Sequence, residues 1–416
     1  MNKKYKILML SDHALSTSGV GCQSRFLIEG LLAKGCWSVR QFGAALKHDN
    51  YDVTEVSPDF IIKPIDGFGN PDMLRLALAT ERPDVLLIFT DPRFFTWLWD
   101  MEDEIHQLCP IAYWHVWDNY PVPKFNDSYY GSTDLINCHS DVTYNIVKEL
   151  YPDRANFIPH ALPDELFFPI SANQRLMWKE QVLGFENRKC FTAFWVNRNA
   201  KRKRSADVLW AWKKFLDKIE DRNDAMLLMH TDPYDQEGPN LVAAAEMLGV
   251  LDRVCFSRER VEFEKMNVLH NISDCCINIA YAEGFGLATL EAMKVGKPII
   301  AAKTGGLTRQ VVDHRDGSEN GVALEIAHQS VVGSQGVPYI YEDYVSVDDT
   351  ADAIFKLYSM GEEEREKLGA KAREYVQSEF SMQTTIDLWH DGLLKLVEDY
   401  QVGKRVINRF EVRELT

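Results

Sequence analysis

Short apolar runs alternate along this chain with longer stretches in which apolar residues recur every three or four positions. The short runs are typical of buried strands, and the spaced stretches are typical of amphipathic helices. Because the two alternate in both halves, the pattern predicts an α/β fold with doubly wound parallel sheets. The predicted strands are 6–10, 85–89, 111–114 and 135–138 in the first half, and 191–196, 226–230, 254–256, 275–280 and 298–302 in the second.

The chain also changes character near its middle. The segment 158–169 contains three prolines and has the composition of a connection between domains. A length of 416 residues is that of two domains rather than one. We therefore expect a first domain over 1–165 and a second over 170–381, with mainly helical structure after Asp352.

The segment 281–293, Tyr-Ala-Glu-Gly-Phe-Gly-Leu-Ala-Thr-Leu-Glu-Ala-Met, is the most informative in the chain. It follows a predicted strand, and Gly284 and Gly286 allow a tight turn from that strand into a helix. Glu283 is then expected at the carboxyl end of a strand and Glu291 early in the helix. Ligands of open α/β sheets bind at that edge, so the two glutamates predict a site.

A run of cations follows the first predicted strand of the second domain. Residues 197–204 read Asn-Arg-Asn-Ala-Lys-Arg-Lys-Arg, and fixed cations at a strand end can neutralise a departing diphosphate. Arg198 and Lys203 are the candidates for this role. A solvated basic turn is the alternative, and a nucleic-acid patch requires more basic surface than one run supplies.

Two further glycine loops follow predicted strands. Gly19 and Gly21 precede a helix whose first-turn N–H groups can approach an anion. Ser24 stands where a dinucleotide fingerprint has its third glycine, and an ordinary tight turn is an equal alternative. The loop 304–307, Thr-Gly-Gly-Leu, offers more backbone donors, with the same alternative.

An aromatic and polar mixture over 111–121 suits stacking on a sugar or a base. It contains His115 and Asp118 as polar candidates. A single histidine after a strand is more often structural, and the same caution applies to His139 and His160.

Charge and absent motifs narrow the possible functions. The net charge of -16 favours solubility and opposes general attraction to nucleic acid or anionic membranes. The eight cysteines form no Cys-x-x-Cys pair, and no apolar run approaches the roughly 20 residues of a membrane span, so a reduced, cytoplasmic protein is expected. The chain has no phosphate-loop, Gly-x-Ser-x-Gly or His-Glu-x-x-His motif. It also has no Asp-x-Asp triplet, so a carboxylate-held metal is not indicated.

Taken in order, these segments resemble the retaining glycosyltransferases of family 4, and the resemblance covers most of the chain. It implies the GT-B fold, two Rossmann-like doubly wound domains facing each other across a cleft, with the helices of 382–416 crossing back to the first domain. It also implies that Glu283 contacts the donated sugar, that Glu291 binds the ribose, and that Arg198 and Lys203 bind the diphosphate. His115 or Asp118 would meet the donor sugar from the first domain. Other residues implied to bind the donor are Gly19, Gly21, Asn197, Gly284, Phe285, Gly286, Leu287, Thr304, Gly305 and Gly306.

The function that follows is transfer of a sugar from a nucleotide sugar, such as a UDP-sugar, to a hydroxyl of a glycan, lipid or small molecule. The resemblance implies retention of configuration by a front-face mechanism with no divalent metal or cofactor. Alternatives are a bacteriophage-type transferase acting on hydroxylated DNA bases, a sugar-nucleotide epimerase or phosphorylase, and an inactive nucleotide-sugar binding module. The sequence does not identify the donor base, the donor sugar or the acceptor.

Overall fold

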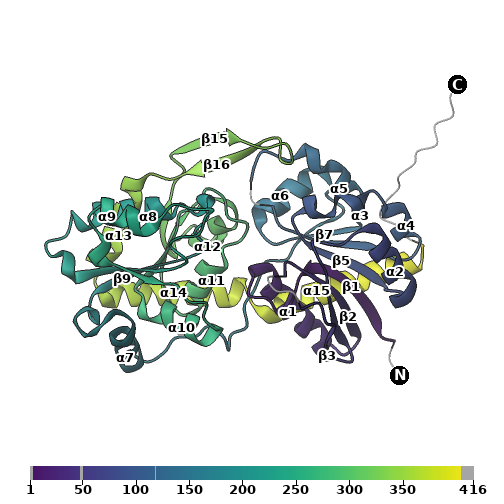
Figure 1. Cartoon of the computed structure of the whole chain (residues 1–416), viewed down its shortest axis with the longest axis horizontal. Helices are drawn as coiled ribbons and strands as arrows, with labels where there is room; N and C mark the ends of the chain where they lie inside the picture. Colours follow the sequence, from purple (N-terminus) through teal and green to yellow (C-terminus); the bar gives the residue numbers. More distant parts are fainter. Residues whose placement is uncertain (1–2, 47–49, 118, 404–416) are drawn as a thin grey trace. The chain divides into compact units, whose positions relative to one another are not determined.

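The computed structural model describes residues 3–46, 50–117 and 119–403, and these form two compact units (Figure 1). The first unit runs to Ala161 and also takes residues 333–340 and the segment that begins at Met382. The second unit consists of residues 162–332 and 341–381. The change from one unit to the other at 161/162 falls inside the proline-containing segment 158–169.

The first unit is built on a sheet of eight strands in the order β3-β4-β2-β1-β5-β6-β7-β8. Neighbouring strands are parallel except β3 and β4, so the predicted α/β class is confirmed. The strands are β1 (Tyr5–Asp12), β2 (Trp37–Ala44), β3 (Thr54–Ser57), β4 (Phe60–Pro64), β5 (Val85–Thr90), β6 (Ile111–His115), β7 (Leu135–Cys138) and β8 (Ala155–Phe157).

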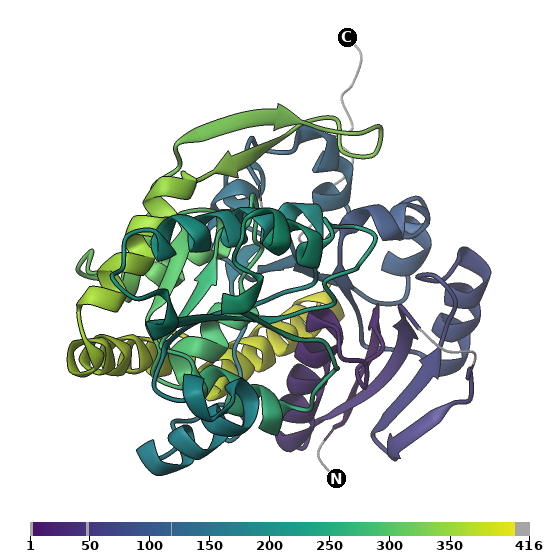
Figure 2. The ribbon, with the colours of Figure 1, turned by 60° about the vertical axis from the view of Figure 1, so that its left-hand side comes forward.

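Helices cover both faces of this sheet. Helix α1 (Gly19–Ala33) and the C-terminal helix α15 (Met382–Gln401) pack on one face, where they lie side by side (Figure 2). Trp389 of α15 is fully buried, and its ring centroid lies 4.9 Å from that of Trp114 in β6. The other face packs against α2 (Pro71–Glu81), α3 (Thr96–Trp99) and α4 (Glu102–His106). The remaining helices of this unit are α5 (Asp127–Gly131) and α6 (Asp141–Leu150).

The second unit contains a six-stranded parallel sheet in the order β11-β10-β9-β12-β13-β14. The chain runs outward from β9 to β10 and β11, and then returns to place β12 on the other side of β9. The strand order therefore reverses between β9 and β12, which is where open α/β sheets bind ligands. The strands are β9 (Phe191–Val196), β10 (Ala225–His230), β11 (Val254–Ser257), β12 (Cys275–Asn278), β13 (Ile299–Ala302) and β14 (Gly321–Leu324).

The helices of the second unit follow the strands in alternation. They are α7 (Ala172–Leu183), α8 (Ser205–Leu216), α9 (Leu241–Met247), α10 (Phe263–Ile272), α11 (Leu287–Lys294), α12 (Thr308–Val311), α13 (Val347–Ser359) and α14 (Glu362–Glu379). A separate two-stranded sheet is formed by β15 (His328–Val332) and β16 (Ile340–Tyr344). Among the described helices, none combines the length and apolar character that a membrane crossing needs. The eight cysteines form no disulfide within the described chain.

Candidate active site

Neighbouring strands bring the predicted cation run and the Glu283 turn to one place. Strands β9 and β12 are parallel partners, so the loops that follow them leave the same edge of the sheet. The two loops are joined by their backbones, because the Tyr281 N–H donates to the Arg202 carbonyl at 2.9 Å. The Arg202 guanidinium also donates to the Ala282 carbonyl at 3.0 Å. The cations and the glutamate therefore form one site.

At the centre of this site Lys203 and Glu283 form a buried ion pair, Nζ to Oε2. Only 7% of Lys203 and 9% of Glu283 is exposed. The Arg202 guanidinium lies 3.9 Å from the same carboxylate oxygen. Burial by itself raises the pKa of Glu283, but Lys203 and Arg202 outweigh it and hold the pKa below its ordinary value. Glu283 is therefore an anion at neutral pH, fixed beside two cations.

The turn after Glu283 requires glycine for two separate reasons. Gly286 has a φ of +91°, in the left-handed region that glycine adopts without strain. Gly306 packs so closely on the turn that a Cβ there would lie 2.5 Å from the Phe285 Cα. The Gly306 N–H also donates to the Glu283 carbonyl at 3.0 Å. The Thr304–Leu307 segment thus fixes the backbone that carries Glu283.

A buried glutamine, which the sequence pattern did not indicate, supports the same turn. Gln310 is fully buried in α12, and its amide donates to the Phe285 carbonyl at 2.6 Å. The Gln310 side-chain carbonyl accepts a hydrogen bond from the Thr289 hydroxyl, with an oxygen-to-oxygen distance of 2.6 Å. Asp343 also supports this region. Its carboxylate accepts a hydrogen bond from the Thr304 hydroxyl at 2.6 Å, and its N–H donates to the Tyr281 carbonyl. No local sequence signal marks either residue, since each contact joins distant segments.

Glu291 is held by a buried histidine. It lies in α11, and the His270 Nε2 of α10 donates to its carboxylate at 2.8 Å. The ring of His270 is fully buried and packs edge-on against Phe194, with centroids 4.9 Å apart. The carboxylate accepts this hydrogen bond, so the proton is on Nε2. His270 therefore sets the direction of the Glu291 carboxylate.

Arg198 and Lys203, the two cations predicted to bind the diphosphate, have different partners in the structure. Arg198 has 60% of its side chain exposed and pairs with Asp235 at 2.8 Å and with Glu237 at 3.1 Å, rather than with the Glu283 loop. Arg204, in contrast, is buried against the rings of Tyr281 and Tyr344, where it supports the fold. Lys203 and Arg202 are the cations of the run that reach Glu283. The Asn197 amide nitrogen is buried with no hydrogen-bond partner in the described chain.

Gly19 and Gly21 belong to the first unit and begin α1. The Gly21 N–H is used within the helix cap, donating to the Ser18 hydroxyl at 2.9 Å. A Cβ at Gly21 would lie 2.2 Å from the Ser16 hydroxyl oxygen, so close packing requires this glycine. These contacts are those of the tight-turn alternative, and the anion contact expected of Gly19 and Gly21 stays a prediction.

The structure places His115, the predicted sugar contact of the first unit, in the core, and the contact itself stays a prediction. His115 ends β6 with no exposed surface, and its Nε2 is hydrogen-bonded to the Tyr130 hydroxyl at 2.8 Å. Burial, with a smaller contribution from His139, lowers its pKa well below the ordinary value. The ring is a core group because it packs between aromatic neighbours and reaches no surface. Asp118, the other candidate, lies outside the described residues.

Comparison with known proteins shows that a large part of the second unit is similar to a family of sequences. Residues 181–375 match the family model described as glycosyl transferases group 1. The chain is 26% identical over 212 residues to the N-acetyl-alpha-D-glucosaminyl L-malate synthase of Bacillus anthracis, covering 50% of this chain and 46% of that protein. It is 27% identical over 194 residues to the D-inositol 3-phosphate glycosyltransferase of Corynebacterium diphtheriae, covering 46% and 43%. The chain thus spans less than half the length of these two relatives.

Solved structures match almost the whole chain. Sucrose-phosphate synthase from Thermosynechococcus elongatus superposes with a TM-score of 0.71 at 18% identity, covering 96% of this chain and 99% of that chain. Anabaena HepE in complex with UDP and glucose gives a TM-score of 0.68 at 15% identity, covering 94% and 100%. These likenesses confirm the predicted fold of two Rossmann-like units.

Proposed function

We propose that this chain, whose residues 181–375 belong to the group 1 glycosyl transferases and whose fold is GT-B, transfers a sugar from a nucleotide diphosphate sugar to an acceptor hydroxyl. The observation that carries the proposal is the buried pairing of Lys203 with Glu283 at the point where the strand order reverses. This pairing places a cation for a leaving phosphate beside a carboxylate that can bind sugar hydroxyls. The solved neighbour Anabaena HepE is described in complex with UDP and in complex with UDP-glucose, which supports a UDP-sugar as the donor.

The charges of the site match those that develop in the reaction. The bond between the sugar C1 and the β-phosphate oxygen breaks through an oxocarbenium-like state, and negative charge grows on the diphosphate. Lys203 and Arg202 stabilise that charge. Arg198 joins them by leaving Asp235 and Glu237, an exchange that costs little because exposed ion pairs are weak. These cations make a divalent metal unnecessary in the proposed mechanism.

The transfer itself needs no protein nucleophile. The acceptor oxygen attacks C1 on the face from which the diphosphate leaves, and the acceptor proton passes to the departing phosphate oxygen. The new bond therefore has the configuration of the old one. Glu283 holds the sugar in the orientation that this front-face step requires. The acceptor is a glycan, a lipid or a small molecule, and relatives named for malate and inositol 3-phosphate favour a small hydroxylated acceptor.

The donor and the stereochemistry are tested together. A thermal-shift panel of nucleotide sugars identifies the donor, because a ligand that binds the folded state raises the unfolding midpoint. With that donor, we expect the product to keep the α or β configuration of the donor and the rate to be unchanged by EDTA. Proton NMR of the product anomeric centre measures the first expectation. An inverted product contradicts the front-face mechanism, and a loss of activity in EDTA that Mg²⁺ restores contradicts metal independence.

We expect His270 to act as a positioning residue for Glu291. In His270→Phe the ring volume is kept but the hydrogen bond to Glu291 is lost, so the Kd for the nucleotide should rise about tenfold. The kcat at saturating donor should change far less. His270→Gln retains a donor group near the position of Nε2 and should restore most of the affinity. Calorimetric titration with the nucleotide measures both variants, and equal weakening in both would show that His270 acts only through packing.

A further inference from the structure

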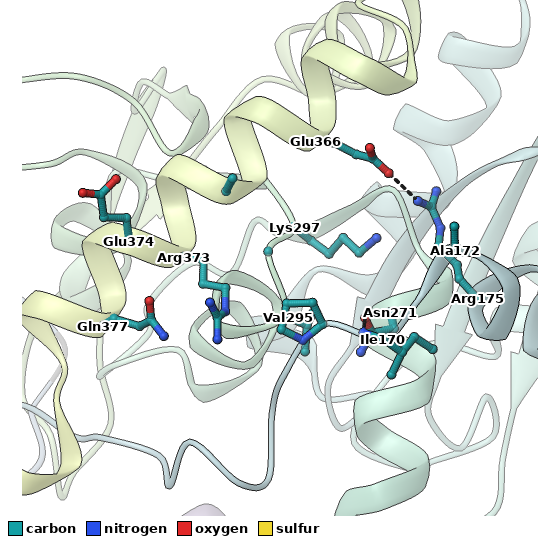
Figure 3. Close-up of a pocket in the computed structure, with 13 residues that line it drawn as sticks. Ile170, Ala172, Arg175, Asn271, Val295, Lys297, Glu366, Arg373, Glu374 and Gln377 are labelled. Carbon is teal, nitrogen blue, oxygen red and sulfur yellow. Dashed lines mark hydrogen bonds and ion pairs between the residues drawn. The ribbon is translucent and has the colours of Figure 1, made fainter.

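The second unit contains a pocket of about 410 Å³ at the edge of its sheet opposite Glu283. Lys297, which lines it, precedes the start of β13, whereas the Thr304 loop follows the end of the same strand. The segment before α7, the end of α11 and one face of α14 form the other walls (Figure 3). The pocket is therefore separate from the candidate active site, although both are built on the same strands.

Lys297 is the unusual feature of this pocket. Only 8% of the residue is exposed, and its side chain extends into the pocket towards Arg175 (Figure 3). Within the described part of the chain, no oxygen atom is placed to accept a hydrogen bond from its Nζ, and no carboxylate lies within 4.0 Å. Burial and the Arg175 charge lower the pKa of Lys297 to about 7, although Asp274 acts in the opposite direction. Among the described residues, the buried Lys297 amine therefore has no contacting anion to stabilise its charged form.

Two arginines line the same pocket. Arg175 extends from α7 and lies beside Lys297 (Figure 3). Arg373 extends from α14 and uses its Nε to donate to the Lys294 carbonyl at 2.9 Å. Three cationic groups from three different segments therefore line one pocket.

The nearby carboxylates do not balance these cations. Asp274 is buried, but it already pairs with Arg175 and Lys179 and lies 3.4 Å from Arg365. Glu366 and Glu362 contact Arg175 at 3.2 Å and 3.3 Å, and both carboxylates are largely exposed. Glu374 also lines the rim and is exposed. The buried groups here therefore include more cations, Lys179, Lys297 and Arg365, than anions, of which Asp274 is the one described, in a chain whose net charge is -16.

We propose that this pocket binds a phosphate group, either as inorganic phosphate or as the phosphate of a small phosphorylated metabolite. A phosphate dianion has enough acceptor oxygens to meet the Lys297 ammonium and the Arg175 guanidinium together, and Arg binds it in a bidentate manner. Arg373 adds positive charge on the other side of the same pocket. The volume is in the range of pockets for small ligands, so an organic group attached to the phosphate also fits. Phosphate binding in this pocket is independent of the proposed glycosyl transfer.

The test is calorimetric titration of the full chain with inorganic phosphate and, separately, with glycerol 3-phosphate. In Lys297→Met the length of the side chain is kept and the charge is removed, so the affinity for both probes should fall about tenfold or more. The thermal midpoint of this variant without phosphate should not fall, because Lys297 has no ion pair to lose. That expectation separates loss of the site from loss of folding.

Two further variants test the phosphate affinity of the pocket. One should increase this affinity and the other should leave it unchanged. Glu366→Gln removes a carboxylate that competes for Arg175, and it should tighten phosphate binding about two- to fivefold. Lys203→Met, in the candidate active site, should weaken nucleotide binding and leave this phosphate site unchanged. Tighter binding of glycerol 3-phosphate than of inorganic phosphate assigns the site to a phosphorylated metabolite, and equal binding assigns it to the phosphate group alone. The proposal is overturned if neither probe binds, or if both bind Lys297→Met as tightly as the unchanged chain.

Discussion

Glu283→Ala is expected to lower the kcat for sugar transfer by about 10²- to 10³-fold, while the affinity for the nucleotide changes only a fewfold. The carboxylate lies at the switch point of the sheet, and Lys203 fixes its position. Its removal takes away the group that orients the sugar and also the anion that holds Lys203 in place. The nucleotide is bound elsewhere in the proposed site, through Glu291 and the backbone loops. Steady-state kinetics and calorimetric titration with UDP measure the two effects separately.

Two controls make this result interpretable. Glu283→Gln keeps the shape and two hydrogen-bonding atoms, so it should lose less stability than Glu283→Ala while the loss of kcat remains large. Glu325→Ala removes an exposed carboxylate that pairs with Lys303 on the surface of the same unit, and it should have no effect on transfer. Equal losses of transfer and of nucleotide affinity in both Glu283 variants would refute the division of roles between Glu283 and Glu291.

Asp274→Ala is expected to cause the largest loss of stability, about 3–5 kcal/mol in the free energy of unfolding. The buried carboxylate pairs with Arg175 at 2.9 Å and Lys179 at 3.1 Å, and it accepts from the Thr192 N–H at 2.8 Å. These contacts join α7, β9 and β12. Alanine leaves the cations buried without their carboxylate, which costs more than the ion pairs contribute. Urea denaturation followed by fluorescence measures the change.

The same residue sets an acid limit on stability. Burial opposes ionisation of Asp274, but Lys179 and Arg175 outweigh it, so its pKa in the folded state lies well below the ordinary value. In the unfolded chain the pKa is about 3.9. The contribution of Asp274 is therefore complete above about pH 4 and is lost as the pH falls towards the lower, folded-state pKa. The stability difference between Asp274→Ala and the unchanged chain should shrink over that acid range.

A matched control for Asp274 is available on the surface. Asp252 pairs with Arg222 at 2.8 Å, but the carboxylate is more than half exposed. Asp252→Ala should change the free energy of unfolding by less than about 1 kcal/mol. A similar small effect for Asp274→Ala would mean that the buried network contributes little to the stability of the second unit.

Much of this fold was predictable because its strands are continuous apolar runs. Strands β5, β7 and β9 begin where the pattern predicted, since they are buried on both faces and read as unbroken hydrophobic segments. Strand β2 was missed because Arg40 and Gln41 interrupt its apolar pattern. Gln41 is nevertheless buried, since its amide donates to the Ser11 hydroxyl and the Asp12 carbonyl. Gln41 is buried because its hydrogen-bond partners come from a distant segment, and a local sequence pattern does not indicate such partners.

The candidate site was predictable only in part, for the same reason. A strand end followed by a glycine turn located Glu283, because both features are local. The run 198–204 contains five similar cations, and nothing in their order separates Lys203, which meets Glu283, from Arg204, which supports the fold. The left-handed backbone at Arg204 and the partners of Arg198 direct these side chains differently. His270 was missed because its contact with Glu291 joins two helices.

The position of α15 has a consequence for the order of events during synthesis. The ribosome releases the residues up to Ala161 well before Met382, yet Ile386, Trp389 and Leu393 of α15 complete the apolar cluster over Trp114 and the inner strands of the first unit. Until that helix emerges, this face of the sheet is covered only in part, by α1, and the exposed remainder is a target for chaperones or aggregation. The unit that begins first is therefore the one that finishes last, and an early stop codon before Met382 removes part of its core rather than a tail.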